Sequence, residues 1–286
     1  MTGARTLPDK DGEGAPSQKR EIMVRIASAV VLAAVALAAV ASPWSFVLLV
    51  VIAGAIIAWE WGRLTRGSGL DGTFMIEAAS VAAVAILVAL GRPDLAFLVL
   101  AAAAVAIGFA GPGASTPGWT IVGLAYAAVP AWALVWLRSD PAWGAVAVLF
   151  LFAIAWTTDT ASYVAGHLIG GPKLAPDISP KKTWSGFIVG SLVPGLIGYA
   201  FAVTLVKDSS AWRLSLVGVA LALACQGGDL VESAVKRRFG AKDASQLIPG
   251  HGGLLDRIDG LLLAAVLAGL IALRDPANPG RALLIW

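Results

Sequence analysis

The sequence predicts an all-α protein, a polytopic integral membrane bundle of about nine transmembrane helices. Hydrophobic residues make up 58% of the 286 residues and charged residues only 14%, against about 25% in soluble domains. The apolar residues gather in runs that approach the roughly 20 residues needed to cross a bilayer as a helix. A soluble protein this apolar would expose large apolar patches, which excludes the soluble globular class.

Nine apolar runs carry this prediction. The expected spans are residues 26–42, 45–61, 74–91, 94–111, 119–137, 142–166, 184–206, 213–231 and 258–274. The segment before them, residues 1–25, is rich in Gly, Pro and charge, so we expect a disordered cytoplasmic tail. We divide the remainder into N-terminal transmembrane helices, residues 26–140, and a C-terminal catalytic transmembrane region, residues 141–286.

The placement of lysine and arginine predicts the orientation. Fifteen of the 21 basic residues fall in the N-terminal tail and in the loops expected on its side of the membrane. Because cytoplasmic loops carry the excess of basic residues, we expect the N-terminus and loops 167–183 and 232–257 in the cytoplasm. The basic residues are dispersed between apolar runs, so we expect no nucleic acid partner.

Two carboxylates lie in or near the apolar runs of the first half. Glu60 lies at a span end between Trp59 and Trp61, and we interpret it as an interfacial residue. Glu77 lies near the start of its span, where an interfacial and a functional role both stay open.

Acidic residues cluster in the second half. Asp229, Asp243, Asp256 and Asp259 supply hard oxygen ligands, which suit magnesium, manganese or calcium rather than zinc. Asp256 and Asp259 are three residues apart and therefore project from one face of a helix, and Asp229 and Glu232 have the same spacing. Two helix ends that carry carboxylates could hold a cation between them.

Basic residues and glycines accompany these acids. Lys236, Arg237, Lys242 and Arg257 are suited to phosphate oxygens. A glycine-rich segment, residues 250–253, precedes the last expected span, where a helix N-terminus attracts anions. His251 in this segment either contacts a nucleotide or braces the loop. The pattern indicates metal-assisted phosphoryl or nucleotidyl chemistry at the cytoplasmic face.

A second polar cluster precedes the first along the chain. Asp159 lies among hydroxyl-bearing residues in an otherwise apolar run, which favours a wet cavity over a helix-interior hydrogen bond. Ser179, Lys181, Lys182 and Thr183 follow in loop 167–183, where the lysines either signal topology or bind phosphate. The charge count places both clusters on the same side of the membrane, so they can meet.

Several motifs of these clusters resemble those of one enzyme family. They are CQGGDLVES from Cys225, SAVKR from Ser233, KD from Lys242, PGHGGLLDRID from Pro249, DTASY from Asp159 and SPKKTW from Ser179. Across residues 233–259 the chain is similar to the signature of phosphatidate cytidylyltransferase, also called CDP-diacylglycerol synthase, without departure. The resemblance is firm over roughly residues 150–260.

The resemblance implies a reaction in which CTP and phosphatidic acid give CDP-diacylglycerol and pyrophosphate in phospholipid biosynthesis. It implies a Mg²⁺-dependent enzyme of the cell inner (plasma) membrane, a homodimer, with a second, monovalent cation left open. The implied catalytic residues are Asp229, Lys236, Arg237, Lys242, Asp243, Asp256 and Arg257. The implied substrate-binding residues are Asp159, Ser179, Lys181, Lys182, Thr183, Glu232, Ser233, His251, Gly252 and Gly253. The implied metal ligands are Asp229, Asp256 and Asp259.

Two other functions stay open at this point. A CTP-using lipid kinase would transfer the γ-phosphate instead of the cytidylyl group. An ion-coupled transporter would bind its coupling ion on intramembrane acids, but we find no internal repeat, and the acids gather at one membrane face rather than at its middle.

Overall fold

The computed structural model describes residues 18–109, 117–249 and 252–286. Almost all regular structure in that part of the chain is helical. In chain order the elements are α1 (Gln18–Val40), α2 (Pro43–Arg66), α3 (Gly72–Ala89), α4 (Pro93–Phe109), α5 (Pro117–Arg138), α6 (Gly144–Leu168), β1 (Lys173–Ala175), β2 (Ser179–Thr183), α7 (Trp184–Leu192), α8 (Pro194–Thr204), α9 (Ala211–Arg238), α10 (Leu255–Ala272) and α11 (Pro279–Leu284). The all-α class is confirmed, with one small antiparallel hairpin, β1–β2, added inside the expected loop 167–183.

Six helical segments of the described chain are long and apolar enough to cross a membrane: α2, α3, α5, α6, α7 with α8, and α9. The protein is therefore a polytopic membrane protein. Apolar parts of α1 (Ile26–Val40) and α4 are shorter, and α10 carries Asp256, Arg257 and Asp259 near its start. Every expected run falls on a helix, but the count of nine spans is not confirmed and stays a prediction.

Several boundaries differ from those expected, and the first two residues of loop 167–183 and the last three of loop 232–257 are helical, in α6 and α10. Residues 18–25, assigned to the disordered tail, are helical, because α1 continues through good helix formers beyond its apolar run; residues 1–17 lie outside the described residues. Residues 232–238, assigned to a loop, extend α9, whose last turn carries three basic residues that favour a helix C-terminus. The seventh run is divided at Pro194, which lacks the N–H that would continue α7.

Local signals explain where other helices begin and end. Gly67, with a φ of 72°, ends α2 in the left-handed conformation that glycine adopts readily. Asp71 caps α3 by accepting a hydrogen bond from Phe74 N. Thr183 caps α7 in the same way by accepting one from Gly186 N. The last residue of the hairpin therefore fixes the direction of the next helix.

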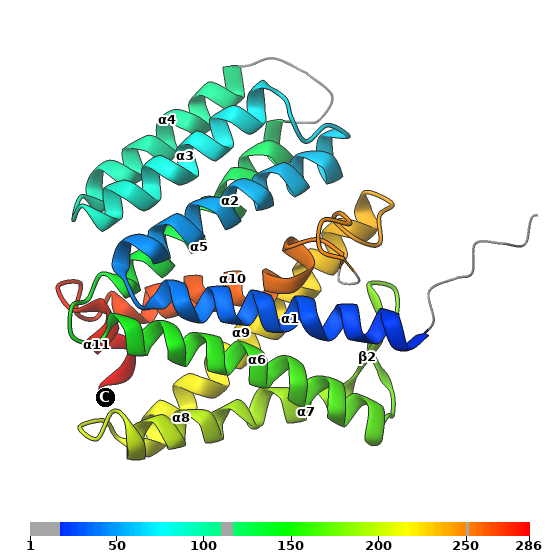
Figure 1. The fold of residues 1–286 in the computed structure, drawn as a ribbon, viewed down its shortest axis with the longest axis vertical. Coiled ribbons are helices and arrows are strands. Elements are labelled where there is room, and N and C mark those ends of the chain that lie inside the picture. Colours follow the sequence, from blue (N-terminus) through cyan, green and yellow to red (C-terminus); the bar gives the residue numbers. More distant parts are fainter. Residues whose placement is uncertain (1–17, 110–116, 250–251) are drawn as a thin grey trace, which may run out of the picture.

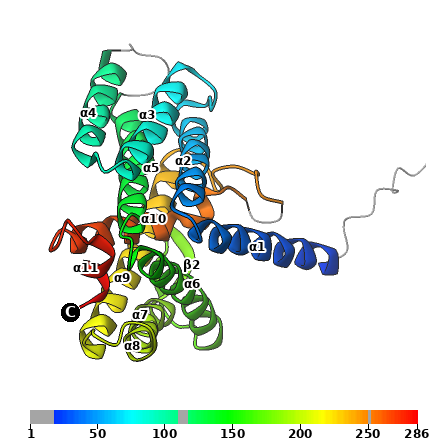
Figure 2. The ribbon, with the colours of Figure 1, turned by 60° about the vertical axis from the view of Figure 1, so that its left-hand side comes forward.

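The helices pack as successive layers. In Figure 1, α3 and α4 lie at the top, α2 and α5 beneath them, α9 and α10 in the middle, and α6 with α7 and α8 at the bottom. The packing of α2 on α3 and α5, and of α9 on α8 and α10, follows this order. Figure 2 shows α1 projecting from the body, in agreement with its many exposed apolar side chains.

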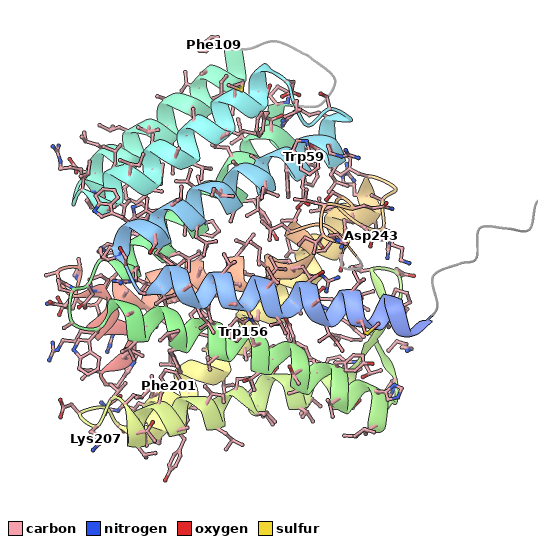
Figure 3. All side chains as sticks on the ribbon, in the orientation of Figure 1. Trp59, Phe109, Trp156, Phe201, Lys207 and Asp243 are labelled. Carbon is pink, nitrogen blue, oxygen red and sulfur yellow. The ribbon has the colours of Figure 1, made fainter. Side chains whose placement is uncertain are left out.

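The connecting segments with most charge gather at one end. Figure 3 places Asp243 and Lys207 at opposite ends of the bundle. The hairpin and the last turn of α9 share the end of Asp243, since Arg237 donates a hydrogen bond to Ile178 O over 3.2 Å. The loop between α9 and α10, called loop 239–254 and described at residues 239–249 and 252–254, lies there too, since Arg237 also donates to Ala241 O. The middle of α1 also contacts this end, since Ser28 Oγ donates a hydrogen bond to Pro249 O. The two polar clusters expected to meet therefore do so.

Candidate active site

A cavity of about 720 Å³ opens at this charged end. Its volume is within the roughly 300–1,000 Å³ typical of small-molecule sites. Helices α6, α7, α9 and α10, the hairpin and loop 239–254 all contribute to its wall. The expected site residues that line it are Asp159, Lys181, Lys182, Thr183, Asp229, Lys236, Asp243, Asp256, Arg257 and Asp259.

Close contact between α9 and α10 sets the position of two of the carboxylates. A Cβ at Gly228 would lie 2.5 Å from Asp259 O, and one at Gly260 would lie 2.9 Å from Cys225 O. Only glycine allows the two backbones to approach this closely. Asp229 and Asp259 follow and precede these glycines directly, so the helix crossing brings both carboxylates to the cavity wall.

An ion pair connects the hairpin to α9. Lys182 Nζ lies 2.6 Å from Asp229 Oδ2, and Ser233 Oγ donates a hydrogen bond over 3.3 Å to the other oxygen of that carboxylate. Lys181, its neighbour on β2, is exposed and also lines the cavity. Because side chains alternate along a strand, Lys182 is directed toward α9 while Lys181 is not.

A second group of charges connects α9 to α10. Lys236 Nζ lies 2.5 Å from Asp256 Oδ1 and 2.7 Å from Glu232 Oε2. Glu232 is only 1% exposed, so its charge depends on this lysine. The spacing of Glu232 and Lys236 is one helical turn, which accounts for their contact within α9.

Asp256 also organises the loop before it. Its Oδ2 accepts hydrogen bonds from Gly253 N over 2.9 Å and from Ala244 N over 3.1 Å. Gly253 lies two residues before the first residue of α10, so this bond holds the end of the loop against the first turn of that helix. Both oxygens of Asp256 are therefore engaged before any ligand binds.

The donor set is suited to a hard cation, since the carboxylates on the cavity wall provide only oxygen ligands. In the described part of the chain, however, no three acidic, histidine or cysteine side chains are gathered closely enough to hold a metal ion. Lysine ammonium groups lie against Asp229 and Asp256 in this arrangement.

Other expected site residues lie beside the cavity rather than in its wall. Arg237 is exposed and donates hydrogen bonds to Ile178 O and Ala241 O, so it braces the hairpin. Lys242 is exposed, and Gly252 has a φ of 86°, which favours glycine. The remaining members of this group are Ser179, Glu232, Ser233 and Gly253. His251 lies outside the described residues.

Comparison with known proteins shows the family to which this chain belongs. A family model described as "Cytidylyltransferase family" matches residues 23–273, which include every expected site residue. The chain belongs to the cytidylyltransferase family.

Curated relatives of this cytidylyltransferase carry a more specific name. A phosphatidate cytidylyltransferase of Brucella suis biovar 1 (strain 1330) is 40% identical over 222 residues, which cover 78% of this chain and 82% of that protein. One of Rickettsia bellii is 39% identical over 51% of this chain and 66% of its own. One of Staphylococcus epidermidis is 42% identical over 44% of this chain and 49% of its own. The chain is thus a nucleotidyltransferase enzyme.

The structure of this cytidylyltransferase also contains polar contacts that the sequence did not predict. Gln226 on α9 donates hydrogen bonds to Phe187 O and to Ser191 Oγ on α7, which hold the cavity wall together. The interpretation of Glu60 as an interfacial residue is wrong, because it is fully buried and bonded to loop 239–254. A carboxylate inside an otherwise apolar run was the available signal. Glu77 is also fully buried, and Arg66 NH2 lies 3.1 Å from it.

Proposed function

We propose that this protein is a phosphatidate cytidylyltransferase that joins CTP and phosphatidic acid to give CDP-diacylglycerol and pyrophosphate. The observation that carries the proposal is the meeting of Lys182 with Asp229, and of Lys236 with Asp256, in the wall of one cavity. The relatives named above are phosphatidate cytidylyltransferases. A site that joins two anionic substrates needs cations against phosphate and carboxylates that hold further cations, and this cavity has both.

The nucleophile in this proposal is the phosphate of the lipid, which is mostly dianionic at neutral pH. One of its oxygens forms a bond to the α-phosphorus of CTP while the bond from that phosphorus to the β-phosphate oxygen breaks. Pyrophosphate leaves with the electron pair of that bond. No serine or cysteine nucleophile and no general base is required, because the attacking oxygen is already deprotonated.

The main barrier to this reaction is repulsion between two anions, and basic residues in and beside the cavity lower it. We assign Lys181 and Lys182 to the lipid phosphate, and Lys236 with Arg257 and Lys242 to the phosphates of CTP and the departing pyrophosphate. Lys182 and Lys236 are at present paired with carboxylates. Their release on substrate binding would free both the ammonium groups for phosphate and the carboxylates for a metal ion.

Asp229, Asp256 and Asp259 are the residues that we expect to hold Mg²⁺, with Asp159 and Asp243 completing the acidic wall. Bound Mg²⁺ would neutralise phosphate charge and stabilise the leaving pyrophosphate. Asp256 has a further task in this proposal, because its hydrogen bonds to Ala244 N and Gly253 N fix the loop beside the ligand set. A monovalent cation beside Mg²⁺ and the homodimer remain predictions.

The lipid needs a route from the bilayer to the cavity, and we propose that it enters between α6 and α7. Tyr163 and Phe187 of these helices line the cavity. A neighbouring groove of about 590 Å³ is lined by apolar side chains of the same two helices, among them Val164, Leu168 and Val189. In this proposal an acyl chain lies in the groove, against the same two helices whose other residues line the cavity.

The orientation that we propose keeps the N-terminus and the cavity in the cytoplasm, where CTP is available, and the protein in the inner membrane. The excess of basic residues at the cavity end supports it. A cysteine-labelling experiment on Lys242→Cys in intact and opened cells tests it. Labelling by a membrane-impermeant reagent in intact cells would contradict this orientation.

Label transfer tests the reaction itself. Purified protein with phosphatidate vesicles and Mg²⁺ should transfer the label of α-labelled CTP to lipid and release the γ-label in pyrophosphate. Transfer of the γ-label to lipid would instead identify a lipid kinase. Transport of a solute without release of pyrophosphate would identify a transporter. Chelation of Mg²⁺ should stop the reaction, and full activity in excess chelator would remove the metal from the proposal.

A further inference from the structure

Glu60, on α2, contacts loop 239–254 and the start of α10 from outside the cavity. Its side chain is fully buried. One oxygen accepts hydrogen bonds from Ser245 Oγ over 2.5 Å and from Leu254 N over 2.9 Å. The other oxygen accepts one from Leu255 N over 2.6 Å. In Figure 3, its neighbour Trp59 is labelled at the end of α2 that approaches the loop of Asp243.

These bonds cap the start of α10. The first amides of a helix have no carbonyl partner within it, and a carboxylate there is stabilised by both the hydrogen bonds and the helix dipole. Such caps usually come from a residue just before the helix. Here Leu255 N is satisfied by a side chain that lies 195 residues earlier in the chain.

Glu60 and Asp256 hold the same short segment from two sides. A Cβ at Gly253 would lie 2.5 Å from Glu60 Oε1 and 3.0 Å from Asp256 Oδ2. Asp256 bonds the amide of Gly253, and Glu60 bonds the next two amides. Any shift of Glu60 would therefore shift the backbone that carries Asp256 at the cavity wall.

The support for Glu60 is rigid. Its neighbour Trp61 is 1% exposed and donates a hydrogen bond to Trp119 O over 2.8 Å. The Trp61 ring also stacks on Tyr126 at a centroid distance of 5.1 Å. These contacts fix α2 on α5 and leave the Glu60 carboxylate little freedom to follow the loop.

We propose that Glu60 is a positioning residue for cytidylyl transfer: it fixes loop 239–254 and the first turn of α10 so that Asp256 and Arg257 meet the substrates in the correct geometry. The inference rests on the proposed function and extends it to the N-terminal helices. It gives α2 a role in the reaction, although no residue of α2 lines the cavity within the described part of the chain.

Glu60→Gln in the full-length protein tests this role. Glutamine keeps the shape of the side chain, but its NH₂ group can only donate. At least one of the three groups that now donate a hydrogen bond to Glu60 would therefore face another donor. Misplacement of a ligand set by a neighbouring residue typically costs about 10- to 100-fold in rate. We expect kcat to fall by about that factor while KM for CTP changes less than about twofold. Hydrogen exchange of the peptide across residues 244–258 should become faster, with the rest of the chain unchanged.

Glu77→Gln is the matched control, because Glu77 is equally buried but pairs with Arg66 and does not contact the loop. It should leave kcat and exchange at residues 244–258 as in the unmodified protein. Ser245→Ala removes only one of the three donors to Glu60. It should change kcat and loop exchange in the same direction as Glu60→Gln but by less, and it serves as the test if Glu60→Gln does not fold.

Normal kcat and normal loop exchange in Glu60→Gln, or in Ser245→Ala if the first variant does not fold, would overturn the proposal. Equal losses in Glu60→Gln and Glu77→Gln, with faster exchange throughout both chains, would overturn it as well, since they indicate general destabilisation. If the unmodified protein transfers no cytidylyl group, the proposed function fails by itself. The exchange measurement then decides alone whether Glu60 holds the loop.

Discussion

Two ion-pair groups among the described residues are alike in composition but differ in what surrounds them. In the N-terminal helices, Arg66 is paired with both Asp71 and Glu77 over 3.0 and 3.1 Å. In the C-terminal helices, Lys236 is paired in a similar way with Glu232 and Asp256. The second group alone borders the large cavity, where further acids and lysines face the same space.

The comparison distinguishes charged groups that are satisfied by one another from carboxylates that have no ion-pair partner and can bind a ligand. Around Arg66, one guanidinium with its fixed fork of donors satisfies two carboxylates, and the group is closed. Asp159 and Asp259 also line the cavity, and among the residues that the structure describes neither has an ion-pair partner. Charges left in this state at a membrane boundary are costly, which is the reason to assign them a function.

The largest effect should come from Asp229. Asp229→Asn preserves shape but removes a carboxylate that both pairs with Lys182 and is expected to hold Mg²⁺. Stabilisation by a metal is worth several kcal/mol, and each 1.4 kcal/mol is tenfold in rate, so kcat/KM should fall about 1,000-fold. Asp275→Asn is the control, because Asp275 pairs with Arg281 outside the cavity. A loss below about threefold in Asp229→Asn would remove it from the site.

A smaller effect should distinguish the two lysines of β2. Lys182→Ala removes an ammonium group directed toward Asp229, and a hydrogen bond to a charged group is worth about 1.5–3 kcal/mol. We expect kcat/KM for phosphatidate to fall about 10- to 100-fold. Lys181→Ala, on the opposite face of the strand, should lose about threefold to tenfold. The reverse order would make Lys181 the main contact of the lipid phosphate, and unchanged kinetics in both variants would return both lysines to a topological role.

The smallest effect concerns the closed group and depends on pH. Burial acts to raise the pKa of Asp71, but the Phe74 N–H and the Arg66 guanidinium outweigh it and hold that pKa below its ordinary value of 3.8. Because the pKa of Asp71 is lower in the folded than in the unfolded chain, its ionised carboxylate stabilises the folded state at pH values above the unfolded pKa. This stabilisation is lost as the pH falls through the folded pKa. Asp71→Asn should therefore cost about 0.5–1 kcal/mol at neutral pH.

The thermal unfolding midpoints of the unmodified protein and of Asp71→Asn, measured between pH 7 and pH 3, give this difference in stability. The difference between the two midpoints should be constant above about pH 4 and should shrink as the pH falls below it. Enzyme activity at neutral pH should be equal in both. A gap that widens at low pH would contradict the assigned shift, and a change in kcat would mean that the closed group communicates with the cavity.

The sequence by itself determined the class of the protein and the approximate place of most of its helices, and it singled out the residues that we propose for the chemistry. Apolar runs of span length are a local property, so each expected run falls on a helix. The spacing of Asp229, Asp256 and Asp259 was readable in the same way, since acids next to apolar runs are rare without a function. The helical extension of α9 was missed because charged residues suit a helix end and a loop equally well.

Only the tertiary structure decided which of these residues meet. The pairing of Lys182 with Asp229 depends on the strand register of the hairpin, and the approach of Asp229 to Asp259 depends on two glycines that let α9 and α10 touch. The contact of Glu60 with Ser245 joins residues 185 positions apart. Contacts at such separation arise from the packing of whole helices, which no local pattern along the chain encodes.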